Sequence, residues 1–181
     1  MPDWTRPIAA FAMFAATCAG AAETPAPHPV LLTADRVWTG TGAPHPGWSV
    51  LIQGGRIVAV GPGAAMTVPA GAERIALPGA TLLPGLIDLH AHLLLHPYNE
   101  ASWDDQVVKE APAYRTALAV RHAADTLQAG FTTLRDLGTE GAGYADVGIR
   151  RAIDEGVIPG PRLLVATHGL AVRRAASYRR R

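Results

Sequence analysis

From Thr81 onward the sequence alternates short apolar runs with longer amphipathic segments. The runs 81–92, 131–137 and 162–167 have the length and apolar character of strands. Between them, residues 113–129 and 144–155 show helical periodicity, and each segment is followed by a glycine. Strands that alternate with helices form parallel βαβ units. The sequence therefore predicts an α/β fold with two βα units and a third strand.

The first helix has an apolar stripe that predicts which of its faces is buried. Its members are Ala113, Ala117, Val120, Ala124 and Leu127. In the second helix the same spacing selects Ala145, Ile149, Ala152 and Ile153. Residues three and four positions apart lie on one face of a helix, so these faces are expected to cover the sheet.

Residues 30–80 have a different character, with several short β-like runs and no helical segment. Strands are predicted at 30–33, 37–38, 49–53, 56–60 and 74–77. Gly54-Gly55 between two of these runs is typical of a two-residue hairpin turn. The region therefore predicts a small β unit that precedes the α/β part.

Two histidines end the first α/β strand, in the run Leu83-Pro84-Gly85-Leu86-Ile87-Asp88-Leu89-His90-Ala91-His92. Side chains at i and i+2 of a strand point to the same face. His90 and His92 would then lie side by side, close enough to bind one metal ion, and neutral imidazole suits zinc and similar ions. The alternative is a pair of histidines that merely pack together.

The motif GLIDLHAH resembles the first barrel strand of the amidohydrolase superfamily of metal-dependent hydrolases. The longer run from Pro84 to Thr167 is similar to the imidazolonepropionase-like and Xaa-Pro-dipeptidase-like branch, and the resemblance covers about residues 30–168. It implies a (β/α)8 TIM-type barrel preceded by part of a small β-sandwich domain. It also implies that His90 and His92 are metal ligands for a divalent ion, zinc before others, with one or two ions in a full-length form.

The resemblance implies a hydrolase that cleaves carbon–nitrogen bonds in a small-molecule or dipeptide substrate, such as an Xaa-Pro dipeptide or a cyclic amide. The family's other ligands lie on later strands, and Lys109, in the loop after the first strand, cannot replace the bridging lysine among them. We therefore expect this chain to be inactive alone. The alternative is a non-catalytic fragment or a metal-binding protein without turnover.

The length of 181 residues conflicts with a complete barrel, which takes about 250 residues. We expect a barrel truncated after about three strands, so that residues 81–172 are its N-terminal part and residues 30–80 a partial β-sandwich domain. Residues 173–181 contain five of the fifteen arginines and form an aberrant tail, typical of a frameshift or truncation. The alternative is a native basic tail that docks on an acidic surface.

Residues 1–22 are typical of a secretory signal peptide, with Arg6 before an apolar core that is too short for the ~20 residues of a membrane span. Ala19 and Ala21 would direct cleavage before Ala22, or one residue later. Residues 23–29 then form a linker. Alternatives are a lipoprotein acylated at Cys18 and a retained N-terminal helix. The expected location is periplasmic or secreted, and the near balance of basic and acidic residues argues against a nucleic-acid partner.

Several further residues are weaker candidates, each with a structural alternative. His96 would touch substrate or lie on the surface, and Asp136 would support the metal site or hold the turn at Gly138. Asp88 is expected to hold the His90 ring by a hydrogen bond. His122, in the middle of a helix, would otherwise be solvated or packed. The remaining candidates are the histidine that ends the third strand and a substrate wall in the long loop, for which a plain surface loop is the alternative: His168, Trp103, Asp104 and Asp105.

Overall fold

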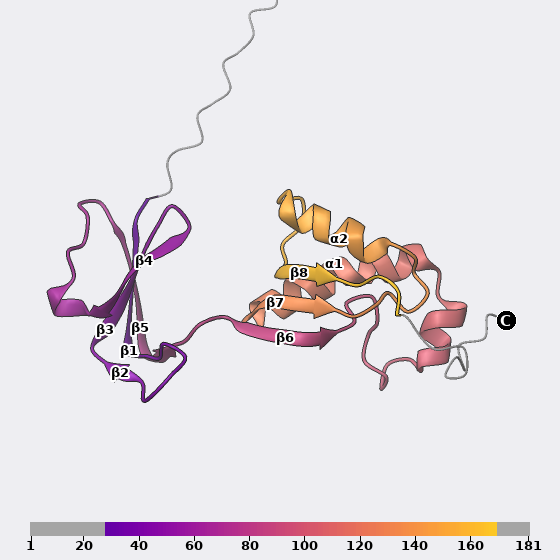
Figure 1. The fold of residues 1–181 in the computed structure, drawn as a ribbon, viewed down its shortest axis with the longest axis horizontal. Coiled ribbons are helices and arrows are strands. Elements are labelled where there is room, and N and C mark those ends of the chain that lie inside the picture. Colours follow the sequence, from indigo (N-terminus) through magenta and orange to yellow (C-terminus); the bar gives the residue numbers. More distant parts are fainter. Residues whose placement is uncertain (1–27, 170–181) are drawn as a thin grey trace, which may run out of the picture. The chain divides into compact units, whose positions relative to one another are not determined.

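The computed structural model describes residues 28–169, and they divide into two compact units (Figure 1). One unit comprises residues 28–37 and 44–81, and the other comprises residues 38–43 and 82–169. The expected signal peptide, most of the expected linker and the arginine-rich tail lie outside the described residues. Within the described part, no helix has the length and apolar character needed to cross a membrane.

The first unit is a five-stranded β-sheet. Its strands are β1 (Val30–Val37), β2 (His45–Pro46), β3 (Trp48–Gln53), β4 (Arg56–Pro62) and β5 (Glu73–Leu82). Their order is β2-β1-β3-β4, and β5 also pairs with β1. The predicted hairpin joins β3 to β4, and both of its turn glycines, Gly54 and Gly55, have positive φ. The strand predicted at 30–33 and Val37 of the one predicted at 37–38 lie in one continuous strand, β1, whose first half pairs with β3 and whose end pairs with β2.

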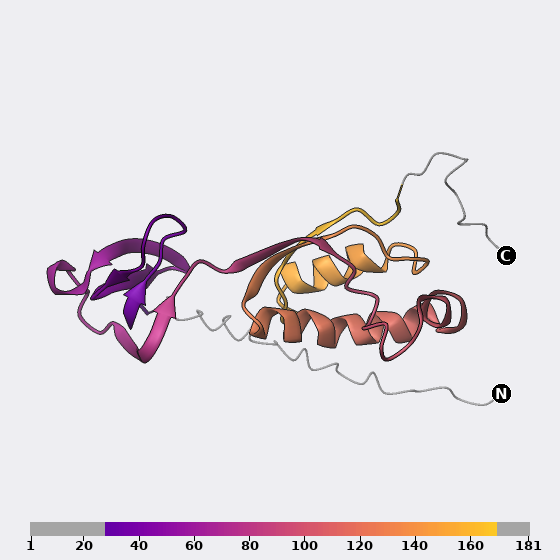
Figure 2. The ribbon, with the colours of Figure 1, turned by 90° about the horizontal axis from the view of Figure 1, so that it is seen from below.

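The second unit confirms the predicted mixed α/β arrangement. Strands β6 (Leu86–Ala91), β7 (Phe131–Asp136) and β8 (Arg162–Val165) form a parallel sheet in the order β6-β7-β8. Helix α1 (Pro112–Gln128) connects the first two strands and α2 (Ala145–Asp154) the last two. Both helices lie on the same face of this sheet (Figure 2). Further barrel strands remain a prediction.

Small residues allow the elements of this unit to approach closely. Leu134 of β7, Leu163 of β8 and Ile149 of α2 are buried together with small side chains of α1. A Cβ on Gly85 would clash with the Thr132 side chain, so the glycine before β6 lets that strand approach β7. Close packing of this kind fixes where each strand ends, and therefore where its last side chains lie.

The structure corrects the predicted buried face of α1. Its fully buried residues are Arg115, Ala119 and Ala123, whereas Ala113 and Ala117 of the predicted stripe are exposed. Alanine contributes little to a hydrophobic stripe, so a stripe made mostly of alanines is a weak guide to the buried face. Arg115 is buried because its guanidinium donates hydrogen bonds to backbone carbonyls. The long loop before α1 also contains a π-helical turn, Asp105–Lys109, that the sequence did not reveal.

Strand β6 is an edge of the parallel sheet within the described part of the chain. Its side chains Ile87 and Leu89 are 61% and 64% exposed, although apolar strand residues are usually covered. The strand nevertheless keeps its parallel pairing with β7 along most of its length. Its C-terminal end, where His90 and His92 lie, is therefore held from the β7 side.

Candidate metal centre

The two histidines of the HxH motif lie next to each other at the C-terminal end of β6. Their ring centroids are 5.4 Å apart, with 65° between the ring planes. His90 is exposed and the side chain of His92 is 26% exposed, so both rings can be reached from solvent. The structure brings the predicted pair together, in an arrangement compatible with two ligands of one ion.

A hydrogen bond determines which nitrogen of His92 is free. Its Nδ1 lies 3.0 Å from the backbone carbonyl oxygen of Gly138, in the turn after β7. A carbonyl oxygen can only accept, so Nδ1 must carry the proton and donate. The lone pair of Nε2 is then free to bind a metal ion, which is the usual arrangement of a metal-binding histidine.

Asp88 holds the strand end and not the His90 ring. Its Oδ1 accepts a hydrogen bond of 2.9 Å from the backbone N–H of His90. The expected contact with the ring is wrong, because the β6–β7 register shifts between Asp88 and Ala91 and changes the regular alternation of side chains. Asp88 therefore contributes to the shape of the site through the backbone.

Asp136, at the C-terminal end of β7, is fully buried beside this pair. Its Oδ1 accepts from the backbone N–H of Gly138 at 2.9 Å, and its Oδ2 accepts from that of Leu93 at 3.0 Å. The expected role in the Gly138 turn is confirmed, and the same carboxylate also fixes the residue after His92. Burial raises the pKa of Asp136, and its two backbone hydrogen bonds oppose that rise.

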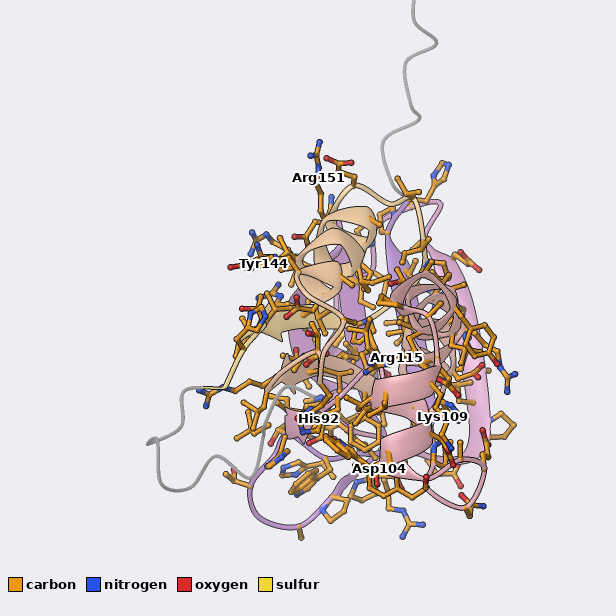
Figure 3. All side chains as sticks on the ribbon, turned by 90° about the vertical axis from the view of Figure 1, so that its right-hand side faces the viewer. His92, Asp104, Lys109, Arg115, Tyr144 and Arg151 are labelled. Atoms are coloured by element: carbon orange, nitrogen blue, oxygen red, sulfur yellow. The ribbon has the colours of Figure 1, made fainter. Side chains whose placement is uncertain are left out.

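Arg115 is a second buried charge at this end of the sheet, and sequence analysis missed it (Figure 3). It reaches from α1 and donates to three backbone carbonyls: those of Leu94 at 3.0 Å, Thr139 at 2.7 Å and Glu140 at 2.9 Å. Burial lowers the pKa of Arg115, while the charges of Glu110 and Glu140 oppose the effect. Hydrophobic periodicity could not reveal such a residue, since it counts an arginine as solvent-facing.

The turns after β7 and β8 are also joined. The backbone N–H of Thr139 donates to the carbonyl of Thr167 at 3.0 Å, and the buried Asp146 accepts from the N–H of Thr167 at 2.9 Å. Glu140 and Thr167 both have positive φ, of 50° and 58°, a backbone conformation that residues other than glycine rarely adopt. Strained backbone of this kind often occurs at functional sites.

His96 takes neither of its expected roles. Its Nδ1 lies 3.2 Å from Glu100 and its Nε2 lies 3.0 Å from Glu110, and the side chain is only 9% exposed. Gln106, also buried, accepts from the backbone N–H of His96 and donates to its carbonyl. His96 therefore holds the long loop together, which sequence reasoning missed because a loop has no periodicity that would show which side chains meet.

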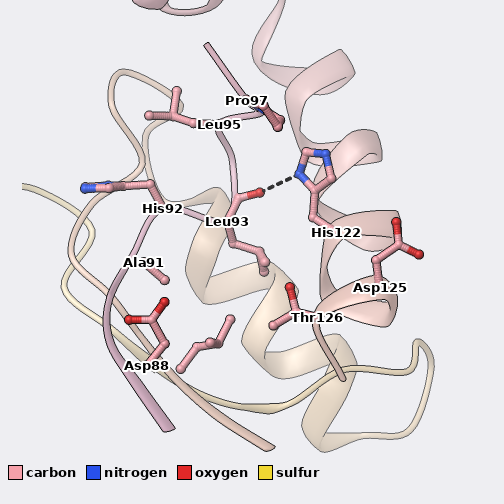
Figure 4. A pocket seen from close by; sticks show the side chains of 10 residues that line it. Asp88, Ala91, His92, Leu93, Leu95, Pro97, His122, Asp125 and Thr126 are labelled. Carbon is pink, nitrogen blue, oxygen red and sulfur yellow. Dashed lines mark hydrogen bonds between the residues drawn. The ribbon is translucent and has the colours of Figure 1, made fainter. Parts of the chain in front are cut away.

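His122 belongs to the wall of a cavity between β6 and α1 and does not join the histidine pair. The cavity has a volume of about 270 Å³ and is also lined by Asp88, His92 and Thr126 (Figure 4). His122 donates from Nδ1 to the carbonyl of Leu93 at 3.0 Å, and the His92 ring points away from it. Of the two alternatives expected for His122, solvation and packing, the structure shows a half-buried ring bonded to the main chain.

The remaining candidates lie apart from the pair. Lys109 forms an ion pair with Asp105, and its side chain is 73% exposed. His168 makes an edge-on ring contact with Tyr144, with centroids 5.2 Å apart. Whether the segment 103–105 forms a substrate wall stays a prediction.

The described residues contain no group of three or more histidine, cysteine, aspartate or glutamate side chains that could hold a metal ion. The imidazoles of His90 and His92 would by themselves make up half of a tetrahedral zinc site. The donor type and the free Nε2 of His92 fit a divalent ion of the zinc class.

The chain is similar to known proteins. The chain is 34% identical over 122 residues to the deacetylase Atu3266 of Agrobacterium fabrum, a match that covers 66% of this chain and 25% of the deacetylase. Three of the similar solved structures illustrate the range. An Xaa-Pro dipeptidase with bound methionine in its active site is 28% identical with a TM-score of 0.66, and the match covers 79% of this chain and 34% of the dipeptidase. An amidohydrolase is 30% identical with a TM-score of 0.65, and the match covers 79% of this chain and 32% of the amidohydrolase. A prolidase complexed with N-methylphosphonate-L-proline is 26% identical with a TM-score of 0.63, and the match covers 79% of this chain and 33% of the prolidase.

The chain thus spans about a quarter to a third of the length of these relatives. The model of the amidohydrolase family matches residues 81–180, which include the HxH strand, both helices and the turns that surround His92. This match covers more than half of the chain, and the chain therefore belongs to the amidohydrolase family.

Proposed function

We propose that this chain carries the first metal-binding strand of a hydrolase that cleaves carbon–nitrogen bonds, with His90 and His92 as ligands of a divalent ion. The observation that carries the proposal is the hydrogen bond from Nδ1 of His92 to Gly138, which leaves Nε2 free beside the exposed His90 ring. When bound, such an ion supplies the Lewis acidity that amide hydrolysis requires.

Xaa-Pro dipeptides are the substrates we propose first, and cyclic amides second. The similar structures support this choice, because two of them are described as an Xaa-Pro dipeptidase and a prolidase. The exposed His90 ring also lies at the C-terminal end of its strand, where barrel enzymes place their substrates.

A second candidate is metal binding without turnover by these 181 residues alone. It is favoured by the absence of any third ligand near the pair in the described part of the chain. Hydrolysis needs a held metal, an activated water and a base that moves its proton. We propose that, in an active enzyme, the other metal ligands and the base lie in the part of the family fold that this chain does not match, which is about two thirds of the similar dipeptidase.

A chimera tests the proposal. Residues 28–169 would replace the matching segment of the similar Xaa-Pro dipeptidase, and hydrolysis of a dipeptide panel would be measured with added zinc. Metal-dependent cleavage is expected in the chimera and should be lost in its His90→Ala, His92→Ala double variant. Equal activity of the chimera and its double variant would contradict the assignment of the two ligands.

A further inference from the structure

Two short segments lie side by side at the metal centre: the β6 exit (residues 92–94) and the β7 exit (residues 138–140). Asp136 accepts one backbone N–H from each, those of Leu93 and Gly138. Arg115 donates to backbone carbonyls of both, those of Leu94 and of the residue pair Thr139 and Glu140. Each exit is therefore fixed by the same two buried charges.

The contact between His92 and Gly138 lies between these anchors. In the β7 exit, Asp136 binds the N–H of Gly138 just before its carbonyl, and Arg115 binds the two carbonyls that follow. The direction of the Gly138 carbonyl is thus determined on both sides. That carbonyl in turn accepts from Nδ1 of His92, and the Glu140 carboxylate lies 3.8 Å from the same nitrogen, so both favour the Nδ1–H form of the ring.

A guanidinium group suits this task better than any other side chain. It is planar and presents donors in fixed directions, whereas an ammonium is a point charge on a flexible stem. Arg115 is 1% exposed and its hydrogen bonds all end on backbone oxygens. The Glu140 backbone that it holds has a φ of 50°, a conformation that needs support from its surroundings.

We propose that Arg115 is a positioning residue for the metal centre, which acts through the β7 exit to keep His92 protonated at Nδ1 and open to metal at Nε2. The inference rests on the proposed role of His92 as a ligand. A residue of helix α1, far from the HxH motif in sequence, would then decide which nitrogen of His92 carries the proton.

The test reads the tautomer of His92 directly in the metal-free 181-residue chain, by long-range proton–nitrogen NMR correlation at a pH where the ring is neutral. In the wild type, His92 is expected in the Nδ1–H form. An Nε2–H form would overturn the proposal. In Arg115→Lys, which keeps the charge but loses the fixed donors, the Nδ1–H population should fall, and zinc affinity should fall about 10- to 100-fold.

Arg121→Lys is the matched control, because Arg121 is on the same helix and its Nε donates to Asp125 on the exposed surface. It should leave the tautomer and the zinc affinity unchanged. A folded Arg115→Lys variant with the wild-type tautomer would overturn the inference and show that Arg115 serves stability alone. Arg115→Gln is a second variant under the same criteria, and failure of both to fold would also assign Arg115 a purely structural role.

The His90→Ala, His92→Ala double variant separates this inference from the proposed function. If zinc affinity is the same in the double variant and the wild type, the ligand assignment itself is wrong. If the double variant loses zinc binding but Arg115→Lys does not change it, the ligands are right and the positioning role is wrong.

Discussion

The imidazole of His92 and the carbonyl of Gly138 are joined by a hydrogen bond of 3.0 Å, although 46 positions of sequence separate the two residues. This contact links the end of one parallel strand to the turn after the next. The sequence identifies His92 only by its spacing from His90, whereas this hydrogen bond shows that its Nδ1 is protonated and its Nε2 is free.

Zinc binding by the histidine pair should be weak, because two ligands form half of a tetrahedral site. The purified chain, titrated with zinc by calorimetry, should show a site that the His90→Ala, His92→Ala double variant lacks. His122→Ala serves as the control, since His122 hydrogen bonds to Leu93 and does not face the pair. An unchanged zinc affinity in the double variant would contradict the assignment of His90 and His92 as ligands.

Asp136→Asn should destabilise the fold by about 1–3 kcal/mol, since an asparagine oxygen replaces one acceptor while its amide faces the other N–H. Urea unfolding followed by circular dichroism measures the loss. Asp125→Asn is the matched control, because Asp125 is exposed on α1. Equal midpoints for the two variants would show that the buried carboxylate is not needed.

The pH dependence of stability should also report Asp136. Burial raises its pKa in the folded chain above the usual value of 3.8. The folded state then keeps its proton where the unfolded chain has lost it, so the free energy of unfolding falls as pH rises from about 3.8 to the folded pKa and is constant above it. The difference between wild type and Asp136→Asn, measured across this range, should show that fall. A difference that is flat or grows with pH would contradict the sign.

Lys109→Met should raise the pKa of Asp105 toward 3.8, because the hydrogen bond from Lys109 is the largest cause of its lowered value. Carboxyl carbon NMR shifts followed through an acid titration measure the change. Lys109→Arg keeps the positive charge and should preserve most of the lowering. Zinc affinity should not change in either variant, and a loss in Lys109→Met would show that Lys109 takes part in metal binding.

Export should remove the N-terminal segment before Ala22 or one residue later, as the small residues Ala19 and Ala21 indicate. N-terminal sequencing of the protein recovered from a bacterial periplasm measures the cleavage site. An Ala19→Arg, Ala21→Arg variant should remain uncleaved. Recovery of an intact Met1 terminus from the wild type would contradict the signal peptide.

The parallel α/β unit could be predicted because its cues are local. Apolar runs, helical periodicity and the glycines after each helix lie within short windows of sequence, and the order strand, helix, strand implies the parallel pairing that the structure shows. The hairpin at Gly54-Gly55 was equally local, since two adjacent residues there adopt positive φ.

The surroundings of His92 could not be predicted because they depend on contacts distant in sequence. Arg115, Gly138 and Asp146 are buried through hydrogen bonds to backbone atoms, and backbone partners leave no pattern in the side chains of a single sequence. The predicted buried face of α1 was wrong for the same reason. The residues that are buried there are an arginine and two alanines, which a search for large apolar side chains does not find. The partners of His96 were missed because they lie within a loop that has no periodicity.

The anchors at the β6 and β7 exits have a consequence for how this site can diversify. Arg115 and Asp136 grip only main-chain atoms of the two exits, which every amino acid other than proline provides. The two anchors themselves therefore set no requirement on the side chains of the exits. Limits on substitution there come from other contacts, because Thr139 is buried and donates to the Gly143 carbonyl, and the Glu140 carboxylate lies 3.8 Å from Nδ1 of His92. Substitutions elsewhere around the strand ends can thus change the surroundings of the site while the Gly138 carbonyl keeps its direction.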